Sequence, residues 1–293
     1  MVLWVDKYRP QSLQKLTYHA KTTQRLDKMV ESGNIPHLMF FGPAGAGKKT
    51  RIYGLLRSFY GAGAAKVRVE QRSFKIKSRV IDYTTLGSNH HVEITPSDAG
   101  RNDTQLIQNV ITDLAQSQNV NQASQRSFKI VILNDVDNLS TAAQHALRRT
   151  MERYVATCRL ILCCESVCRV IAPLRSRCVP VRIPAPSPQE IVEVLQHVAL
   201  KEKITLPVEF AQSIALQSQG NMRRAILMLE GAKVQNYPFT ADSKVRTADW
   251  EMFIDDLARV IIEEQSPQRL MLARNKFYEL LANCIPPEVI IKV

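Results

Sequence analysis

The feature that most constrains this chain is a glycine-rich stretch near its start, GPAGAGKKT, at residues 42–50. It follows an apolar run at 38–41 and opens a helix-forming segment at 50–56. Strand, glycine-rich loop and helix in this order are typical of a loop that binds nucleotide phosphates through backbone N–H groups and the helix N-terminus. A purely structural glycine turn is the alternative. The residues assigned to the phosphate site are Gly42, Pro43, Ala44, Gly45, Ala46, Gly47, Lys48, Lys49 and Thr50.

The same region departs from a hydrolytic site. Lys49 stands where a Ser or Thr would ligate Mg²⁺, and Thr50 cannot replace it because one helical step turns the side chain by about 100°. After the apolar strand at 128–133, the residue at the metal position is the neutral Asn134, and Asp135 is shorter than the Glu that usually orients water. The sequence therefore predicts a site that holds ATP or ADP, in which Mg²⁺ is doubtful and hydrolysis improbable.

Composition favours an anionic partner. The chain of 293 residues has 39 Lys+Arg against 27 Asp+Glu, a formal net charge of +12. Nucleic acid is the leading candidate, and a solvated basic surface is the alternative. Asp6, Lys7 and Arg9 come too early for a secretory signal, and no apolar run is long enough for a membrane span. The six cysteines contain no C-x-x-C pair, so no metal site is expected.

The order of elements predicts an α/β fold. Apolar strands alternate with amphipathic helices, a pattern typical of a parallel, doubly wound sheet. Residues 66–86 alternate apolar and basic side chains, which predicts an antiparallel hairpin with a polar break near Gln71. Its lysines serve either DNA contact or protection of a sheet edge. Helices are expected from Asp103 or Thr104 to about Gln116 and from Thr141 to Tyr154.

Proline-rich and polar stretches divide the chain into three parts. The segment Pro184-Ala185-Pro186-Ser187-Pro188 predicts a stiff linker followed by three helices, and a second linker begins near Pro238. Two further helices follow, and the apolar pattern at 289–293 shows no helix-stop signal, so the last part is expected to be incomplete. We therefore predict domains at 1–183, 184–237 and 238–293.

Five motifs in this order resemble one protein family. They are WVDKYRP at 4–10, the GKKT ending of the glycine-rich loop, ALRRTME at 146–152, Ser176-Arg177-Cys178 and GNMRRA at 220–225. Together they resemble the small subunits of replication factor C, the eukaryotic clamp loader of the AAA+ class, nearest to the subunit-three type with its degenerate ATPase site. The resemblance covers essentially the whole chain. It implies an AAA+ P-loop domain, a helical lid domain and a partial helical collar.

The resemblance also implies roles for single residues. Arg177 corresponds to the arginine finger that completes a neighbouring subunit's ATP site, and an ordinary salt bridge is the alternative. Glu165 takes the first sensor's place, where hydrolytic members carry Asn, and its carboxylate should repel phosphates. The implied nucleotide contacts outside the loop are Val5, Tyr8, Arg9, Pro10 and Arg223, the last as the second sensor.

Partners follow from the same resemblance. It implies a heteropentamer with the other replication factor C subunits, the sliding clamp (proliferating cell nuclear antigen) as substrate, and primer–template DNA, in replication and repair in the nucleus. Implied DNA contacts are Asn102, Thr104, Arg148 and Arg149, although Gln105 stands where family members often carry Arg. The alternatives are an autonomous DNA-dependent ATPase, a nucleotide-free assembly scaffold, and a truncated product that competes for partners.

Overall fold

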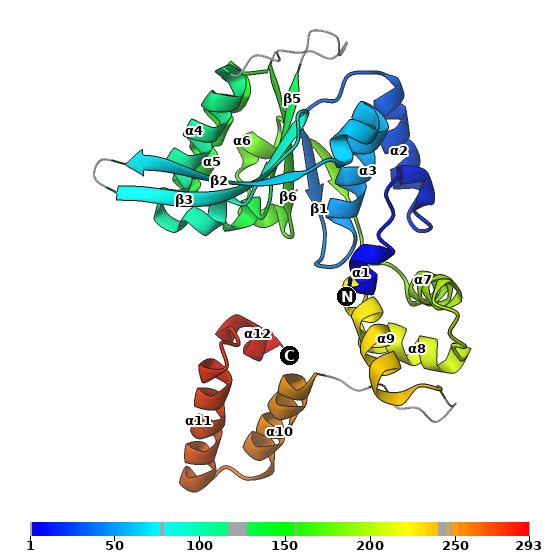
Figure 1. Ribbon diagram of the computed structural model, residues 1–293. Coiled ribbons are helices and arrows are strands. Elements are labelled where there is room, and N and C mark those ends of the chain that lie inside the picture. Colours follow the sequence, from blue (N-terminus) through cyan, green and yellow to red (C-terminus); the bar gives the residue numbers. More distant parts are fainter. Residues whose placement is uncertain are drawn as a thin grey trace. The chain divides into compact units, whose positions relative to one another are not determined.

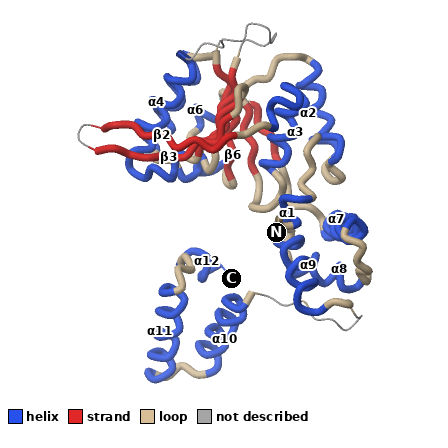
Figure 2. The backbone as a smooth tube through the Cα atoms, viewed as in Figure 1, coloured by secondary structure: helices blue, strands red, loops and turns tan. Residues whose placement is uncertain are grey.

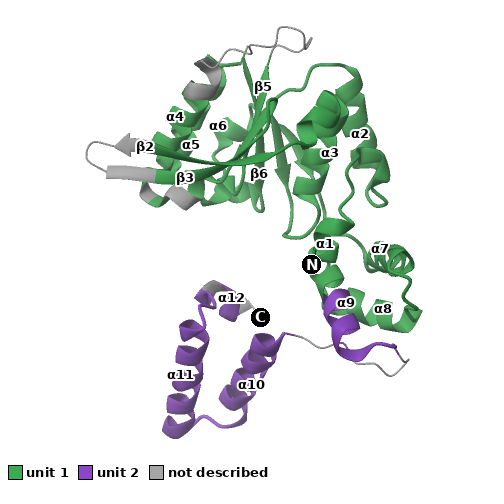
Figure 3. Cartoon of the chain, in the orientation of Figure 1, with its two compact units in different colours: residues 1–227 green, residues 228–293 purple. Residues whose placement is uncertain are grey.

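A computed structural model describes residues 2–76, 79–116, 128–155, 157–239, 245 and 248–292. The chain divides into two compact units, Met1–Leu227 and Met228–Val293, which Figure 3 draws in different colours. We describe each unit by itself. This division does not bear on the three-part division at 183/184 and 237/238, which stays a prediction.

A seven-stranded sheet forms the centre of the first unit, in the order β2-β3-β4-β5-β6-β1-β7 (Figure 1). The strands from β4 to β7 in this order pair in parallel, and β2 and β3 join antiparallel at the β4 edge. Long apolar runs suit the parallel strands because helices cover both faces of the sheet. The strands are β1 Leu38–Phe41, β2 Arg68–Ile76, β3 Arg79–Gly87, β4 His91–Ile94, β5 Lys129–Leu133, β6 Cys158–Cys164 and β7 Val179–Arg182.

Alternate residues of β5 show how the two faces are filled. Ile130 and Ile132 pack in the cluster with helices α2 and α3, whereas Val131 and Leu133 pack in the cluster with α4 and α5. Figure 2 shows helices on both sides of the strands. The predicted doubly wound α/β sheet is therefore confirmed. The helices of this part are α1 Trp4–Lys7, α2 Ala20–Glu31, α3 Lys48–Tyr60, α4 Asp103–Gln116, α5 Thr141–Arg153 and α6 Ala172–Arg175.

The predicted hairpin is present, but the polar break predicted near Gln71 does not interrupt its strand. β2 runs through Gln71, which pairs with Thr84, and the last described pair is Ile76 with Arg79. The strand pairing therefore continues past Gln71 to Ile76 and Arg79. Polar residues along one edge strand do not end it, because a strand that is solvated on one side needs apolar residues only on the other. The paired ends extend past the helices of the sheet in Figure 2.

The predicted lid helices follow the sheet. They are α7 Pro188–Lys201, α8 Val208–Gln217 and α9 Met222–Asn236, of which the first two and the start of α9 belong to the first unit. The Ser187 hydroxyl accepts from the Glu190 N–H while the Glu190 carboxylate accepts from the Ser187 N–H, a capping box that starts α7 directly after the proline-rich linker.

The second unit contains α10 Asp249–Glu263, α11 Pro267–Ala282 and α12 Pro287–Lys292. Its small core holds the buried side chains of Ile254, Leu257, Ala273, Leu280 and Ile290. Within the described ranges, no helix combines the length and the apolar character needed to cross a membrane.

Candidate nucleotide site and arginine cluster

The glycine-rich loop joins β1 to α3 and is closed around its own lysine. The Lys48 ammonium donates to the carbonyl oxygens of Gly42 at 2.7 Å and Pro43 at 3.0 Å. Gly42, Gly45 and Gly47 all have positive φ, so the loop adopts backbone conformations that other residues rarely take. This is a preformed concave loop at a helix N-terminus, an arrangement that binds phosphate.

The start of the third lid helix lies against this loop. A Cβ added to Gly45 would stand 1.7 Å from Asn221 Oδ1, so the Asn221 side chain fills the space beside the glycine. The same oxygen accepts from the Arg224 N–H at 3.1 Å and begins α9. Arg223, expected to reach the nucleotide from the lid, is exposed on the first turn of this helix.

A buried arginine lies directly behind the loop. The Arg51 side chain is 0% exposed and donates to the carbonyl oxygens of Ala46 at 3.4 Å and Tyr18 at 3.0 Å. Its guanidinium also lies over the Tyr18 ring, 4.5 Å from the centroid. In the described part of the chain no carboxylate pairs with it, so its charge adds to the positive field at the phosphate site. The sequence analysis did not single out Arg51, although a charged residue on the apolar side of a helix is a sign of a buried, functional side chain.

A second missed residue, Glu93, organises the opposite side of the pocket. Its side chain is 4% exposed; Oε1 lies 3.1 Å from the Lys49 ammonium and accepts from the Asn134 amide at 2.7 Å. The Tyr53 hydroxyl donates to Oε2. Burial opposes ionisation of Glu93, but the hydrogen bonds from Tyr53 and Asn134 and the charge of Lys49 outweigh it and lower its pKa. Lys49 is therefore held by an ionised, buried carboxylate.

These side chains do not fit a Mg²⁺ ion. The Lys49 ammonium stands where a Ser or Thr hydroxyl would bind the ion. After β5, the neutral amide of Asn134 stands where hydrolytic P-loop proteins carry a carboxylate. Asn134 Oδ1 is buried without a partner among the described residues, and a single neutral oxygen is a poor site for an ion that usually binds one or two carboxylates. Nor do the described residues contain a group of three His, Cys, Asp or Glu side chains able to hold a metal.

The other two residues of the expected hydrolytic machinery face solvent. Asp135 has positive φ and is exposed at the end of β5, and Glu165 is exposed at the end of β6. The neighbouring Asp137 carboxylate accepts from the N–H groups of Glu165 at 3.1 Å and Ser166 at 3.2 Å. The ends of β5 and β6 therefore lie at the same edge of the sheet as the glycine-rich loop. Glu165 is fixed there by the hydrogen bond from its backbone N–H to Asp137.

The N-terminal motif lies against both the loop helix and the lid. The Arg9 guanidinium is 3.4 Å from Thr50 Oγ1 and lies over the Tyr53 ring, 5.5 Å from the centroid. The Tyr8 hydroxyl donates to Glu202 just after α7. Val5 and Pro10 are partly buried in the same segment. Arg9 is thus beside the first turn of α3, whereas Tyr8 points to the lid.

Arg177, the arginine expected to act on a neighbouring subunit, is held by a carboxylate on α5. Arg177 donates from Nε to Glu152 Oε1 at 2.8 Å, and its Nη2 lies 2.5 Å from the same oxygen. Arg148 Nε lies 3.5 Å from that oxygen too, so Glu152 on α5 gathers two arginines from the ALRRTME and Ser-Arg-Cys motifs. Arg149 is exposed on the same helix. Sequence reasoning missed the part of Glu152.

Two of the four residues assigned to DNA, Asn102 and Thr104, lie where α4 begins. Asn102 and Thr104 are partly exposed, and Thr104 donates from its backbone and hydroxyl to Asp103 Oδ1 at 2.6 and 3.2 Å. Buried Asp103 also accepts from the Ser140 N–H at 2.8 Å, which ties the start of α4 to the start of α5. The structure therefore brings Asn102 and Thr104 close to the helix that carries Arg148 and Arg149.

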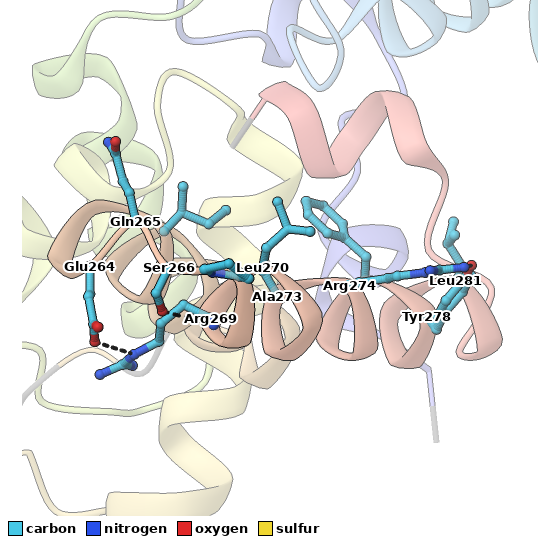
Figure 4. A pocket seen from close by; sticks show the side chains of 12 residues that line it. Glu264, Gln265, Ser266, Arg269, Leu270, Ala273, Arg274, Tyr278 and Leu281 are labelled. Carbon is cyan, nitrogen blue, oxygen red and sulfur yellow. Dashed lines mark hydrogen bonds and ion pairs between the residues drawn. The ribbon is translucent and has the colours of Figure 1, made fainter.

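A separate hollow lies in the C-terminal unit. It has a volume of about 840 Å³ and is lined along one side of α11, as Figure 4 shows. Leu270 is 68% exposed and Tyr278 55% exposed there, and Arg269 closes one end at 3.4 Å from Glu264. An apolar helix face of this kind is typical of a surface that packs against another protein segment.

Comparison with known proteins places the chain in a family. Three family models match: DNA polymerase III, delta subunit, at residues 18–187; RCF1/5-like, AAA+ ATPase lid domain, at 193–234; and Replication factor C subunit 3, C-terminal domain, at 250–293. Replication factor C subunit 3 of Homo sapiens is 50% identical over 293 residues, 100% of this chain and 82% of the relative. The chain belongs to the replication factor C subunit 3/5 family.

Other members of the replication factor C family match over similar lengths. The subunit 3 of Arabidopsis thaliana is 51% identical over 99% of this chain and 83% of the relative. Subunit 5 of Schizosaccharomyces pombe is 38% identical over 99% of this chain and 83% of its own. Among solved structures, the RuvB Holliday junction branch migration motor of Thermotoga maritima aligns with a TM-score of 0.58 at 16% identity, covering 87% of this chain and 79% of RuvB. This likeness confirms the predicted AAA+ fold.

Proposed function

We propose that this chain is a clamp-loader subunit that binds ATP or ADP with little or no hydrolysis of its own. In a heteropentamer with other replication factor C subunits, it supplies Arg177 to a neighbour's ATP site. The assembly places a sliding clamp, proliferating cell nuclear antigen, on primer–template DNA during replication and repair in the nucleus. The observation that carries this proposal is a preformed phosphate loop beside an ammonium held by a buried carboxylate, Lys49 with Glu93.

The division of labour follows from these residues. The loop N–H groups and Lys48 bind phosphates, which stabilises the lid position because Asn221 lies against Gly45. Asp135 is exposed and one methylene shorter than the usual Glu, so at this position it is poorly suited to orient an attacking water. Arg177 would stabilise charge on a phosphoryl group bound next door, and its alternative use is the salt bridge with Glu152.

Nucleotide binding is tested by Lys48→Ala. The substitution should weaken the affinity of the purified chain for ADP by about tenfold or more, because it removes the ammonium available to the outer phosphates. Isothermal titration measures the effect, and Lys21→Ala, at an exposed position in the first turn of α2, is the control. Absence of ADP binding by the wild-type chain would favour the nucleotide-free scaffold, whereas equal affinities would show that Lys48 is not needed for ADP binding. Brisk ATP turnover by the chain alone, abolished in Lys48→Ala, would favour the autonomous ATPase.

Assembly is tested on α11. Leu270→Asp should abolish co-purification with the other replication factor C subunits, because Leu270 is 68% exposed on the apolar face that we assign to the collar. The free chain should keep its thermal midpoint, since the side chain is not part of the core. Leu200→Asp on α7, at a leucine that is 77% exposed, is the matched control and should assemble normally. Normal assembly of Leu270→Asp would remove this face from the interface.

A further inference from the structure

Lys49 is fixed at the point where the carboxyl ends of β4 and β5 meet the loop helix. Its ammonium lies 3.1 Å from Glu93 Oε1, the atom that also accepts from Asn134 Nδ2 at 2.7 Å. Asn134 directly follows β5, the place of the metal-binding acid in hydrolysing P-loop proteins. The Lys49 side chain is still 39% exposed, so it remains accessible from solvent.

Glu93 keeps this ammonium in place. The carboxylate is buried, and Lys49 is the one cation that pairs with it in the described ranges. Moving Lys49 aside would leave a buried carboxylate with only the Tyr53 hydroxyl and the Asn134 amide, which is costly. A divalent ion brought to the same point would meet a fixed positive charge within a few ångströms, and both Glu93 oxygens already have donors.

Other positive charges at the glycine-rich loop can offset the negative charge of the phosphates, as a divalent ion would. Within the described ranges, Lys48 donates hydrogen bonds to two carbonyl oxygens, and Arg51 is buried behind the loop without a described carboxylate. The N-terminus of α3 adds its partial positive charge. A polyphosphate therefore meets protein cations on the loop side and Lys49 on the β4–β5 side.

We infer that the pocket binds its nucleotide without a divalent ion, with the Lys49 ammonium in the ion's place. The ligand is a free nucleoside di- or triphosphate and not its magnesium complex. Mg²⁺ in solution then weakens binding, because it competes with the pocket for the same phosphate oxygens. This inference rests on the nucleotide binding proposed above and adds the form of the nucleotide that is bound.

The test compares dissociation constants of the wild-type chain for ADP in excess EDTA and in excess MgCl₂, measured by calorimetry. The expected affinity for ADP in EDTA exceeds that in MgCl₂. A dissociation constant in MgCl₂ that is equal to or lower than that in EDTA overturns the inference while nucleotide binding stands. Absence of binding in both buffers overturns the nucleotide site itself. With Mn²⁺ as the probe, electron paramagnetic resonance of the ADP complex should show no protein-bound ion, and a bound signal contradicts the inference.

A designed reversal tests the part of Lys49. Lys49→Thr combined with Asn134→Asp restores a hydroxyl and a carboxylate, and ADP should then bind about tenfold or more tightly in MgCl₂ than in EDTA. Lys21→Thr, which changes the second residue of α2 as Lys49→Thr changes the second residue of α3, should behave as wild type. A folded double variant whose affinity ignores Mg²⁺ contradicts the assignment. If this variant does not fold, the wild-type comparison decides alone.

Discussion

Replacing Arg177 with alanine is expected to lower ATP turnover at the neighbouring subunit's site about 10³-fold, because a finger supplied in trans stabilises charge that develops on the transferred phosphoryl group. Nucleotide bound to this chain should stay in place, since Arg177 contacts Glu152 and Pro173 and not the glycine-rich loop. The measurement is ATP turnover by the assembled ring with clamp and DNA. The full effect is visible when the neighbour is the sole subunit able to hydrolyse.

The control for this experiment lies two residues before Arg177. Arg175 is exposed at the end of α6, and Arg175→Ala should leave turnover unchanged. Glu152→Gln separates the finger from a structural salt bridge, because it loosens Arg177 without removing it and should cost far less turnover than Arg177→Ala. Wild-type turnover by the Arg177→Ala ring would show that the finger assignment is wrong and that the salt bridge is the arginine's role.

Gly42→Ala should destabilise the nucleotide-binding unit by at least about 3 kcal/mol and abolish nucleotide binding. A Cβ at this position would lie 1.9 Å from the carbonyl oxygen of Ile183, and φ is +151°. The clash is with backbone, so no side-chain rotation relieves it. The chain must instead open the contact between the end of β1 and the residue after β7. Urea denaturation gives the change in unfolding free energy.

Gly33→Ala is the matched control for Gly42→Ala. Gly33 has φ +69°, but an added Cβ would meet nothing within 4 Å. Its cost should therefore be only the backbone strain of about 1 kcal/mol, with nucleotide affinity unchanged. Equal destabilisation by both substitutions would show that strain alone, and not the close approach of Ile183, determines the effect at Gly42.

Local patterns were enough for much of the fold. The apolar run at 38–41, the glycines after it and the helix that follows are neighbours in sequence, so their order predicts the loop and its site. The bounds of α4, expected from Asp103 to about Gln116, agree with the structure because capping and 3.6-residue periodicity are local signals. The break predicted near Gln71 was wrong because polarity along an exposed strand does not mark its end.

The partners of the site's charges could not be read in the same way. Asn134 donates a hydrogen bond to Glu93, 41 residues away in the sequence, and Arg177 donates one to Glu152, 25 residues away. Parallel strand order decides which strand ends are adjacent, and it is set by long-range packing and not by any local pattern. The sequence showed that Lys49 stands where a metal ligand is usual. It did not decide whether the Lys49 side chain stays at that position or turns away from it.

The sequence by itself predicted a phosphate-binding loop that lacks the usual hydroxyl ligand of Mg²⁺, because residue type and spacing along one loop are enough for that prediction. Only the tertiary structure showed which group pairs with the Lys49 ammonium. Strands β4 and β5 pair in parallel, and this brings Glu93 beside Asn134 and under Lys49. A buried carboxylate requires a counter-charge, so the lysine that stands in place of the usual hydroxyl ligand is also the lysine that the fold holds in place.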